Sequence, residues 1–72
     1  METLTAEQIT QNYSAALDSV TVITELMALD TRDAEQTATV ARNVEHLELM
    51  VTKDYWTTED LAPLNAAITA GS

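Results

Sequence analysis

The chain has 72 residues, of which 12 are acidic and three are basic, and its formal net charge is −9. Nucleic acids and anionic membranes both attract cationic side chains, so this charge argues against direct binding to either. Cysteine is absent, which excludes disulfides and thiolate metal sites. A chain this short therefore has to stabilise its core by helix packing or by association.

Hydrophobic residues make up 46% of the chain, alongside one glycine and one proline. This composition is too apolar for an intrinsically disordered protein. No apolar run approaches the ~20 residues of a membrane-spanning helix, and no basic segment followed by an apolar one marks a secretion signal. The sequence therefore predicts a soluble protein that is not exported.

A first helix is predicted from about residue 6 to residue 29. Thr5 and Gln8 have the spacing of a capping box, in which each side chain binds the backbone N–H of the other residue. Apolar or small residues then recur every three or four positions, at Ile9, Tyr13, Ala16, Val20, Ile23 and Met27. The β-branched segment 19–24 taken alone is typical of a strand, but the helical period continues on both sides of it.

A second helix is predicted over residues 34–53, after a turn in which Asp33 or Thr31 is the N-cap. Its apolar stripe consists of Val40, Val44, Leu47 and Val51, widened by Ala41 and Met50. Acidic Asp33 and Glu35 at the start and Lys53 in the last turn are favourable for the helix dipole. The connection is short enough to make the two helices antiparallel neighbours.

A third, shorter helix is predicted over about residues 60–70, with Leu61, Leu64 and Ile68 on one face. With Asp60 as the N-cap, Pro63 falls in the first turn, where its missing N–H has no cost. With Thr57 or Thr58 as the N-cap, the first turn is irregular. Gly71 fits a left-handed C-terminal cap.

The fold class predicted from these elements is all-α. We expect one small domain over residues 1–72, built as a long antiparallel helical hairpin plus a short C-terminal third helix. This arrangement leaves two groups of side chains as a candidate interface.

The first group is a second apolar strip on the first helix, formed by Val22, Leu26 and Leu29. Asp18 and Glu25 border this strip and belong to a solvated face. A two-helix hairpin buries only one side of each helix, so the strip must meet the third helix, another copy of the chain or a different protein. The acidic border favours a different protein with a basic rim.

The second group is the pair Tyr55 and Trp56, which follows the second helix. Trp56 either closes the end of the hairpin and anchors the third helix, or it is an interface hot spot, since Trp and Tyr are enriched at such sites.

A catalytic or metal-binding centre is not expected. His46 is the single histidine, and its helical neighbours Glu45 and Glu48 cannot chelate with it because they do not stand three or four residues away. In the Glu-x-x-His pattern of di-metal helix bundles, Asn43 occupies the position of the glutamate. We therefore expect no cofactor and no enzymatic activity.

Two stretches, NVEHLELMVTKDYWTTEDLAPLNAAITAG from Asn43 to Gly71 and the acidic opening LTAEQITQNYSAALDSV, resemble short uncharacterised acidic helical proteins encoded by bacteriophages. The resemblance covers most of the chain and contains no motif with a known chemical role. It implies a virion component or an assembly accessory protein, located in the virion or the host cytoplasm. The competing hypothesis is an acidic inhibitor that occupies a basic site on a host protein.

Overall fold

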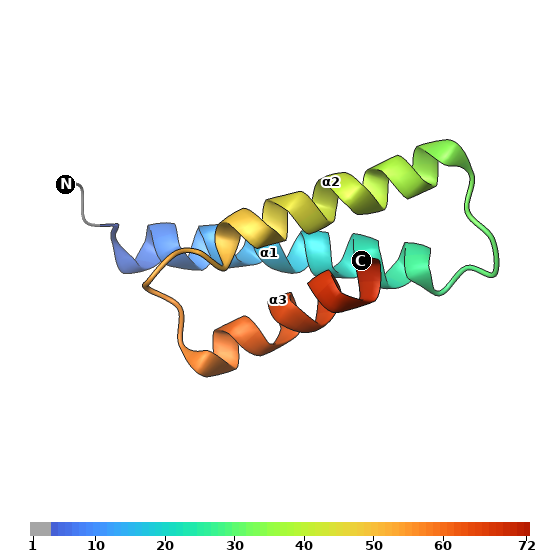
Figure 1. Cartoon of the computed structure of the whole chain (residues 1–72). Coiled ribbons are helices and arrows are strands. Elements are labelled where there is room, and N and C mark those ends of the chain that lie inside the picture. The colour runs from blue at the N-terminus through green and yellow to red at the C-terminus, as the bar shows by residue number, and fades with distance from the viewer. Residues whose placement is uncertain (1–3) are drawn as a thin grey trace.

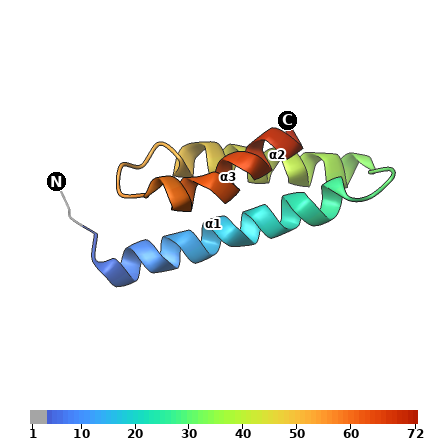
Figure 2. The ribbon, with the colours of Figure 1, turned by 90° about the horizontal axis from the view of Figure 1, so that it is seen from below.

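The described residues, 4–72 of a computed structural model, form three helices and no strand: α1 (Ala6–Met27), α2 (Ala34–Met50) and α3 (Thr58–Gly71). The helices α1 and α2 form a long antiparallel hairpin (Figure 1). Seen after a quarter turn, α2 and α3 lie side by side over one face of α1 (Figure 2). The molecule measures 42 × 20 × 17 Å. The predicted all-α hairpin with a short third helix is confirmed.

Every one of these helices begins with a complete capping box, which satisfies N–H groups that have no partner inside the helix. The side-chain-to-backbone pairs are Thr5 with Gln8, Asp33 with Gln36, and Thr57 with Asp60. The tightest of these bonds joins the Gln36 N–H to the Asp33 carboxylate at 2.7 Å. The Thr5 prediction is confirmed, and Asp33 rather than Thr31 is the second N-cap.

The helix α1 ends at Met27, two residues before the predicted end. The Leu29 N–H donates to the Leu26 carbonyl at 3.2 Å instead of to that of Glu25, and a side chain also binds this end of the helix. The Arg32 guanidinium donates to the carbonyl of Leu26 at 3.2 Å and to that of Leu29 at 3.1 Å. These bonds bring a positive charge to the negative end of the helix dipole from the loop that follows.

The helix α2 ends at Met50 rather than at residue 53, so Lys53 does not lie in its last turn as predicted. In a continued helix, the Met50 carbonyl would accept a hydrogen bond from the backbone N–H of Asp54. Here it accepts from the Lys53 N–H at 3.1 Å and from the Trp56 indole N–H at 2.8 Å. The indole thus fixes the end of α2.

The helix α3 begins at Thr58, two residues before the predicted start, and of the N-caps considered Thr57 is the one that the chain uses. Asp60 instead completes the capping box of Thr57. Pro63 is consequently the sixth residue of the helix and leaves the carbonyl of exposed Glu59 without its intrahelical donor.

The predicted left-handed cap at Gly71 is also wrong, since Gly71 is helical and has no positive φ. The glycine is needed for a close approach. A Cβ atom placed there would lie 2.5 Å from Cγ2 of Val44 and 3.2 Å from both Ile23 and Val40. The backbone of the last turn of α3 therefore rests directly on the side chains of the hairpin.

The core lies where the three helices meet. Its buried members are Ala16, Ile23, Val40, Val44, Leu47, Leu64 and Ala67. This set contains the centre of both predicted apolar stripes, whereas Val20, Met27 and Val51 are only partly buried at its margin.

We expect Gly71→Ala to destabilise the protein by roughly 1–3 kcal/mol, as overpacking of a core does. An alanine at an ordinary helical position is more favourable than glycine by up to about 1 kcal/mol, so the sign of the effect tests the close approach. Thermal unfolding followed by circular dichroism should give a lower Tm. Ala66→Gly is the control: Ala66 is exposed on the same helix, so this variant measures only the difference in helix propensity between alanine and glycine. An unchanged or higher Tm for Gly71→Ala would contradict the contact.

Candidate interaction surface

The predicted apolar strip of Val22, Leu26 and Leu29, called the α1 strip below, is only partly covered by the fold. Leu26 is half-buried and packs against the core, and Val22 is also half-buried. Leu29 follows the end of α1 and keeps 42% of its surface exposed. The strip therefore becomes more accessible towards the α1–α2 turn.

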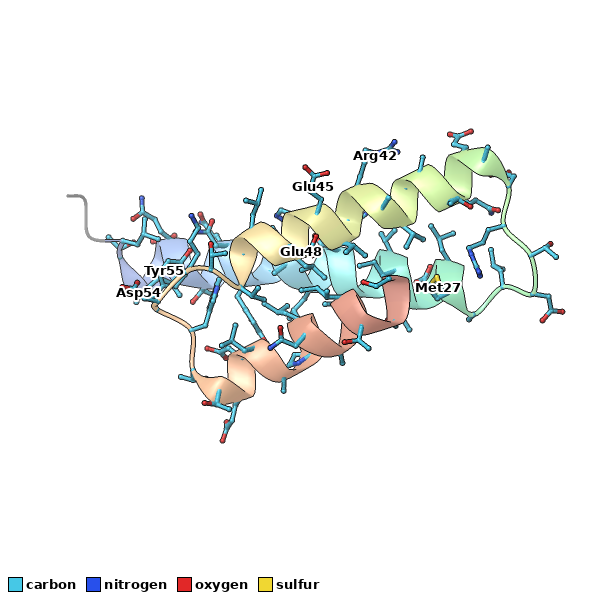
Figure 3. The ribbon with its side chains drawn as sticks, in the orientation of Figure 1. Met27, Arg42, Glu45, Glu48, Asp54 and Tyr55 are labelled. Carbon is cyan, nitrogen blue, oxygen red and sulfur yellow. The ribbon has the colours of Figure 1, made fainter. Side chains whose placement is uncertain are left out.

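The third helix stops before it reaches Leu29. Gly71, the last residue of α3, lies at the level of Ile23. With a helical rise of about 1.5 Å per residue, Leu26 lies about 4.5 Å further along α1, and Leu29 lies beyond it. Figure 3 shows Met27 beyond the C-terminal end of α3, near the end of α1. Of the three predicted ways to cover the strip, packing against α3 thus leaves Leu29 open.

Among residues 4–72, two other large apolar side chains are exposed, Leu17 at 38% and Leu49 at 63%. Neither belongs to a predicted apolar surface, because each falls outside the apolar stripe of its helix. Single exposed leucines are common on protein surfaces. Leu49 lies on α2 and serves below as a matched control for Leu29.

The guanidinium groups of both arginines donate to neutral oxygen atoms. The Arg32 guanidinium donates to two backbone carbonyls, and the Arg42 guanidinium donates to the Thr39 hydroxyl at 3.1 Å. Arg42 and Glu45 both point away from the bundle on α2 (Figure 3). Asp18 and Glu25 are exposed on α1, a helix whose sequence contains no lysine or arginine. The strip is therefore bordered by two carboxylates along α1 and by the Arg32 guanidinium at its C-terminal end.

The second predicted group, Tyr55 and Trp56, joins Tyr13 in an aromatic cluster at the other end of the molecule. The Trp56 ring centroid lies 5.3 Å from that of Tyr13 and 4.5 Å from that of Tyr55. Trp56 is 8% exposed, and Figure 3 shows Tyr55 at the end of the molecule where α1 begins. This position favours the interpretation that Trp56 closes the hairpin, and an interface role for the pair stays a prediction.

Two hydroxyl groups tie this cluster to its surroundings. The Tyr13 hydroxyl donates to the Asp60 carbonyl at 2.9 Å, and the Tyr55 hydroxyl accepts from the Asn12 amide at 3.4 Å. Burial raises the pKa of the Tyr13 hydroxyl above its ordinary value, and the negative charge of Asp60 raises it further. Tyr13 thereby links α1 to the first turn of α3.

We expect Tyr13→Phe to lower the free energy of unfolding by about 1 kcal/mol at neutral pH, the net value of one hydrogen bond. Because the folded-state pKa lies above the unfolded value of about 10, the neutral phenol stabilises the fold below pH 10. This contribution disappears as the pH rises through the folded-state pKa. Urea unfolding from pH 7 to 11 should show the difference between wild type and variant shrinking.

Tyr55→Phe is the control for this measurement, because it removes a hydroxyl engaged in a longer hydrogen bond. A difference between wild type and Tyr13→Phe that stays constant over the whole pH range would contradict the assignment to Tyr13.

His46 has a hydrogen-bond partner, Ser19, that was not predicted from the sequence. Its Nδ1 atom lies 2.8 Å from the hydroxyl oxygen of Ser19, which is 6% exposed. Ser19 stands between the apolar stripe and the α1 strip, and no sequence pattern marks it as a partner of His46. The pair satisfies a buried hydroxyl in the contact between α1 and α2.

Within residues 4–72, no group of three or more histidine, aspartate or glutamate side chains could hold a metal ion. No helix in this part of the chain is long and apolar enough to cross a membrane. Comparisons of the chain with protein-family models, with curated proteins and with solved structures found no match.

Proposed function

We propose that the chain is a non-enzymatic protein–protein interaction module that binds its partner through the α1 strip. The observation that carries this proposal is that Leu29, 42% exposed beyond the end of α3, follows the half-buried Val22 and Leu26, whereas exposed Leu49 lies outside the apolar stripe of α2. Burial of a large aliphatic side chain contributes roughly 1.5–3 kcal/mol. When a partner covers Leu29 and the exposed parts of Val22 and Leu26, part of this free energy stabilises the complex.

The Ser19–His46 pair does not argue for an enzyme. A serine nucleophile has to reach the substrate, and a base has to take its proton in that position. The Ser19 hydroxyl belongs to a residue that is 6% exposed and lies between two packed helices. A structural hydrogen bond accounts for the pair without any reaction.

The bacteriophage resemblance gives this proposal a biological setting. In that setting the chain is a virion component or an assembly accessory protein, present in the virion or the host cytoplasm. The partner is another protein or a second copy of the chain.

A second candidate is an acidic inhibitor that occupies a basic site on a host protein. It is favoured by the net charge of −9 and by the arginines, whose hydrogen bonds go to neutral oxygens. Salt distinguishes the two candidates, since screening weakens contacts between exposed charges and leaves apolar contacts nearly unchanged.

Site-specific photo-crosslinking tests the proposal. A photoreactive amino acid replaces Leu29 in one variant and Leu49 in the matched control, and both variants are irradiated in infected or expressing cells. We expect a discrete adduct from position 29 in higher yield than from position 49, and the same adduct when a lysate of these cells is irradiated at high salt. Equal yields from both positions would contradict binding through the strip, and an adduct that forms at low salt but not when the lysate is irradiated at high salt would favour the inhibitor.

A further inference from the structure

The α1 strip has the length and spacing of a helix-binding face. Val22 and Leu26 are four residues apart and lie on one side of α1. Leu29 follows two residues after the helix ends, and its N–H donates to the Leu26 carbonyl at 3.2 Å. At the helical rise, the seven steps from Val22 to Leu29 correspond to about 10.5 Å, or roughly two turns of a partner helix. An apolar face of this spacing is what an amphipathic helix presents when it docks on another helix.

The charges along the strip select the partner. On α1, Asp18 stands four residues before Val22 and Glu25 three residues after it, so both carboxylates are neighbours of Val22 on the helix surface. Both carboxylates are exposed. The Arg32 guanidinium donates to the carbonyls of Leu26 and Leu29 and places one positive charge at the other end of the strip. Beyond the strip, Asp30 is exposed as well.

A second copy of the chain is a poor occupant of this surface. Self-packing through the strip would bring Asp18 and Glu25 of one copy near the same carboxylates of the other. Like charges placed together across an interface cost several kcal/mol, and each copy carries a net charge of −9. A partner with basic residues beside its apolar face converts this repulsion into attraction.

We propose that the α1 strip binds a basic amphipathic helix of a partner protein, with apolar residues on Val22, Leu26 and Leu29 and lysines or arginines facing Asp18 and Glu25. This inference rests on the proposed function and names the chemistry of its partner. An extended strand is a poorer occupant, because the described helices offer no sheet edge to pair with its backbone.

The test uses a synthetic 18-residue peptide in which leucines repeat at helical spacing and lysines fill the flanking positions. The control is a peptide of the same composition whose leucines are rearranged so that they no longer fall on one face of a helix. Each peptide is titrated into the ¹⁵N-labelled full chain at physiological salt. We expect saturable binding of the amphipathic peptide, with chemical-shift changes centred on residues 18–30, and much weaker binding of the control.

Variants of the chain assign the contact. Leu29→Ser and Glu25→Lys should each weaken binding about tenfold, the effect of losing one interface hot spot. The matched substitutions Leu49→Ser and Glu45→Lys lie on α2 and should change the dissociation constant less than twofold. Leu29 and Glu25 are both exposed, so their variants should keep the wild-type helicity. If Leu29→Ser fails to fold, Glu25→Lys still decides the question.

Three results would overturn the inference. One is equal binding of the two peptides, which reflects net charge alone. Another is an equal effect of the α1 and α2 substitutions. The third is a concentration-dependent dimer in sedimentation that Leu29→Ser abolishes. An in-cell adduct from position 29 with a segment that is not a basic helix would refute this inference while leaving the proposed function intact.

Discussion

The contact between the last turn of α3 and the hairpin is the constraint on which the rest of the structure depends. Because Gly71 has no side chain, the α3 backbone can lie against Val44, Ile23 and Val40. At the other end of α3, the indole of Trp56 binds the end of α2. With both ends held, Leu64 and Ala67 are pressed into the core. The same contact decides which surface stays open, since α3 ends at the level of Ile23.

The elements and their packing faces follow from local signals. Capping residues and apolar periodicity are properties of neighbouring residues, so the start of α1, the start of α2 and buried Ile23, Val44 and Leu47 are predictable from the sequence. The helix ends are not, because they depend on side chains from later segments. Arg32 and Trp56 bind carbonyls at the ends of α1 and α2, and no local pattern connects these residues to those carbonyls. The role of Gly71 depends equally on a distant helix.

The candidate site also has features that local sequence patterns predict and features that depend on contacts between distant segments. The α1 strip is visible in the sequence as apolar residues outside the main stripe, and its acidic border is visible as well. How far each member is covered depends on where α3 stops and on the packing of Leu26, which only the fold determines. The Ser19–His46 hydrogen bond joins residues 27 positions apart. A serine or a histidine in the sequence does not by itself indicate which residue it will bind.

The placement of Trp56 determines what optical spectroscopy can detect in this protein. It is the only tryptophan, it is buried, and its ring touches Tyr13 and Tyr55 at the end of the long axis away from the α1–α2 turn. Its emission therefore reports whether α3 is docked on the hairpin. The same fluorophore is remote from Leu29, so a ligand seated there leaves the indole environment unaltered, and intrinsic fluorescence separates loss of the fold from occupancy of the surface.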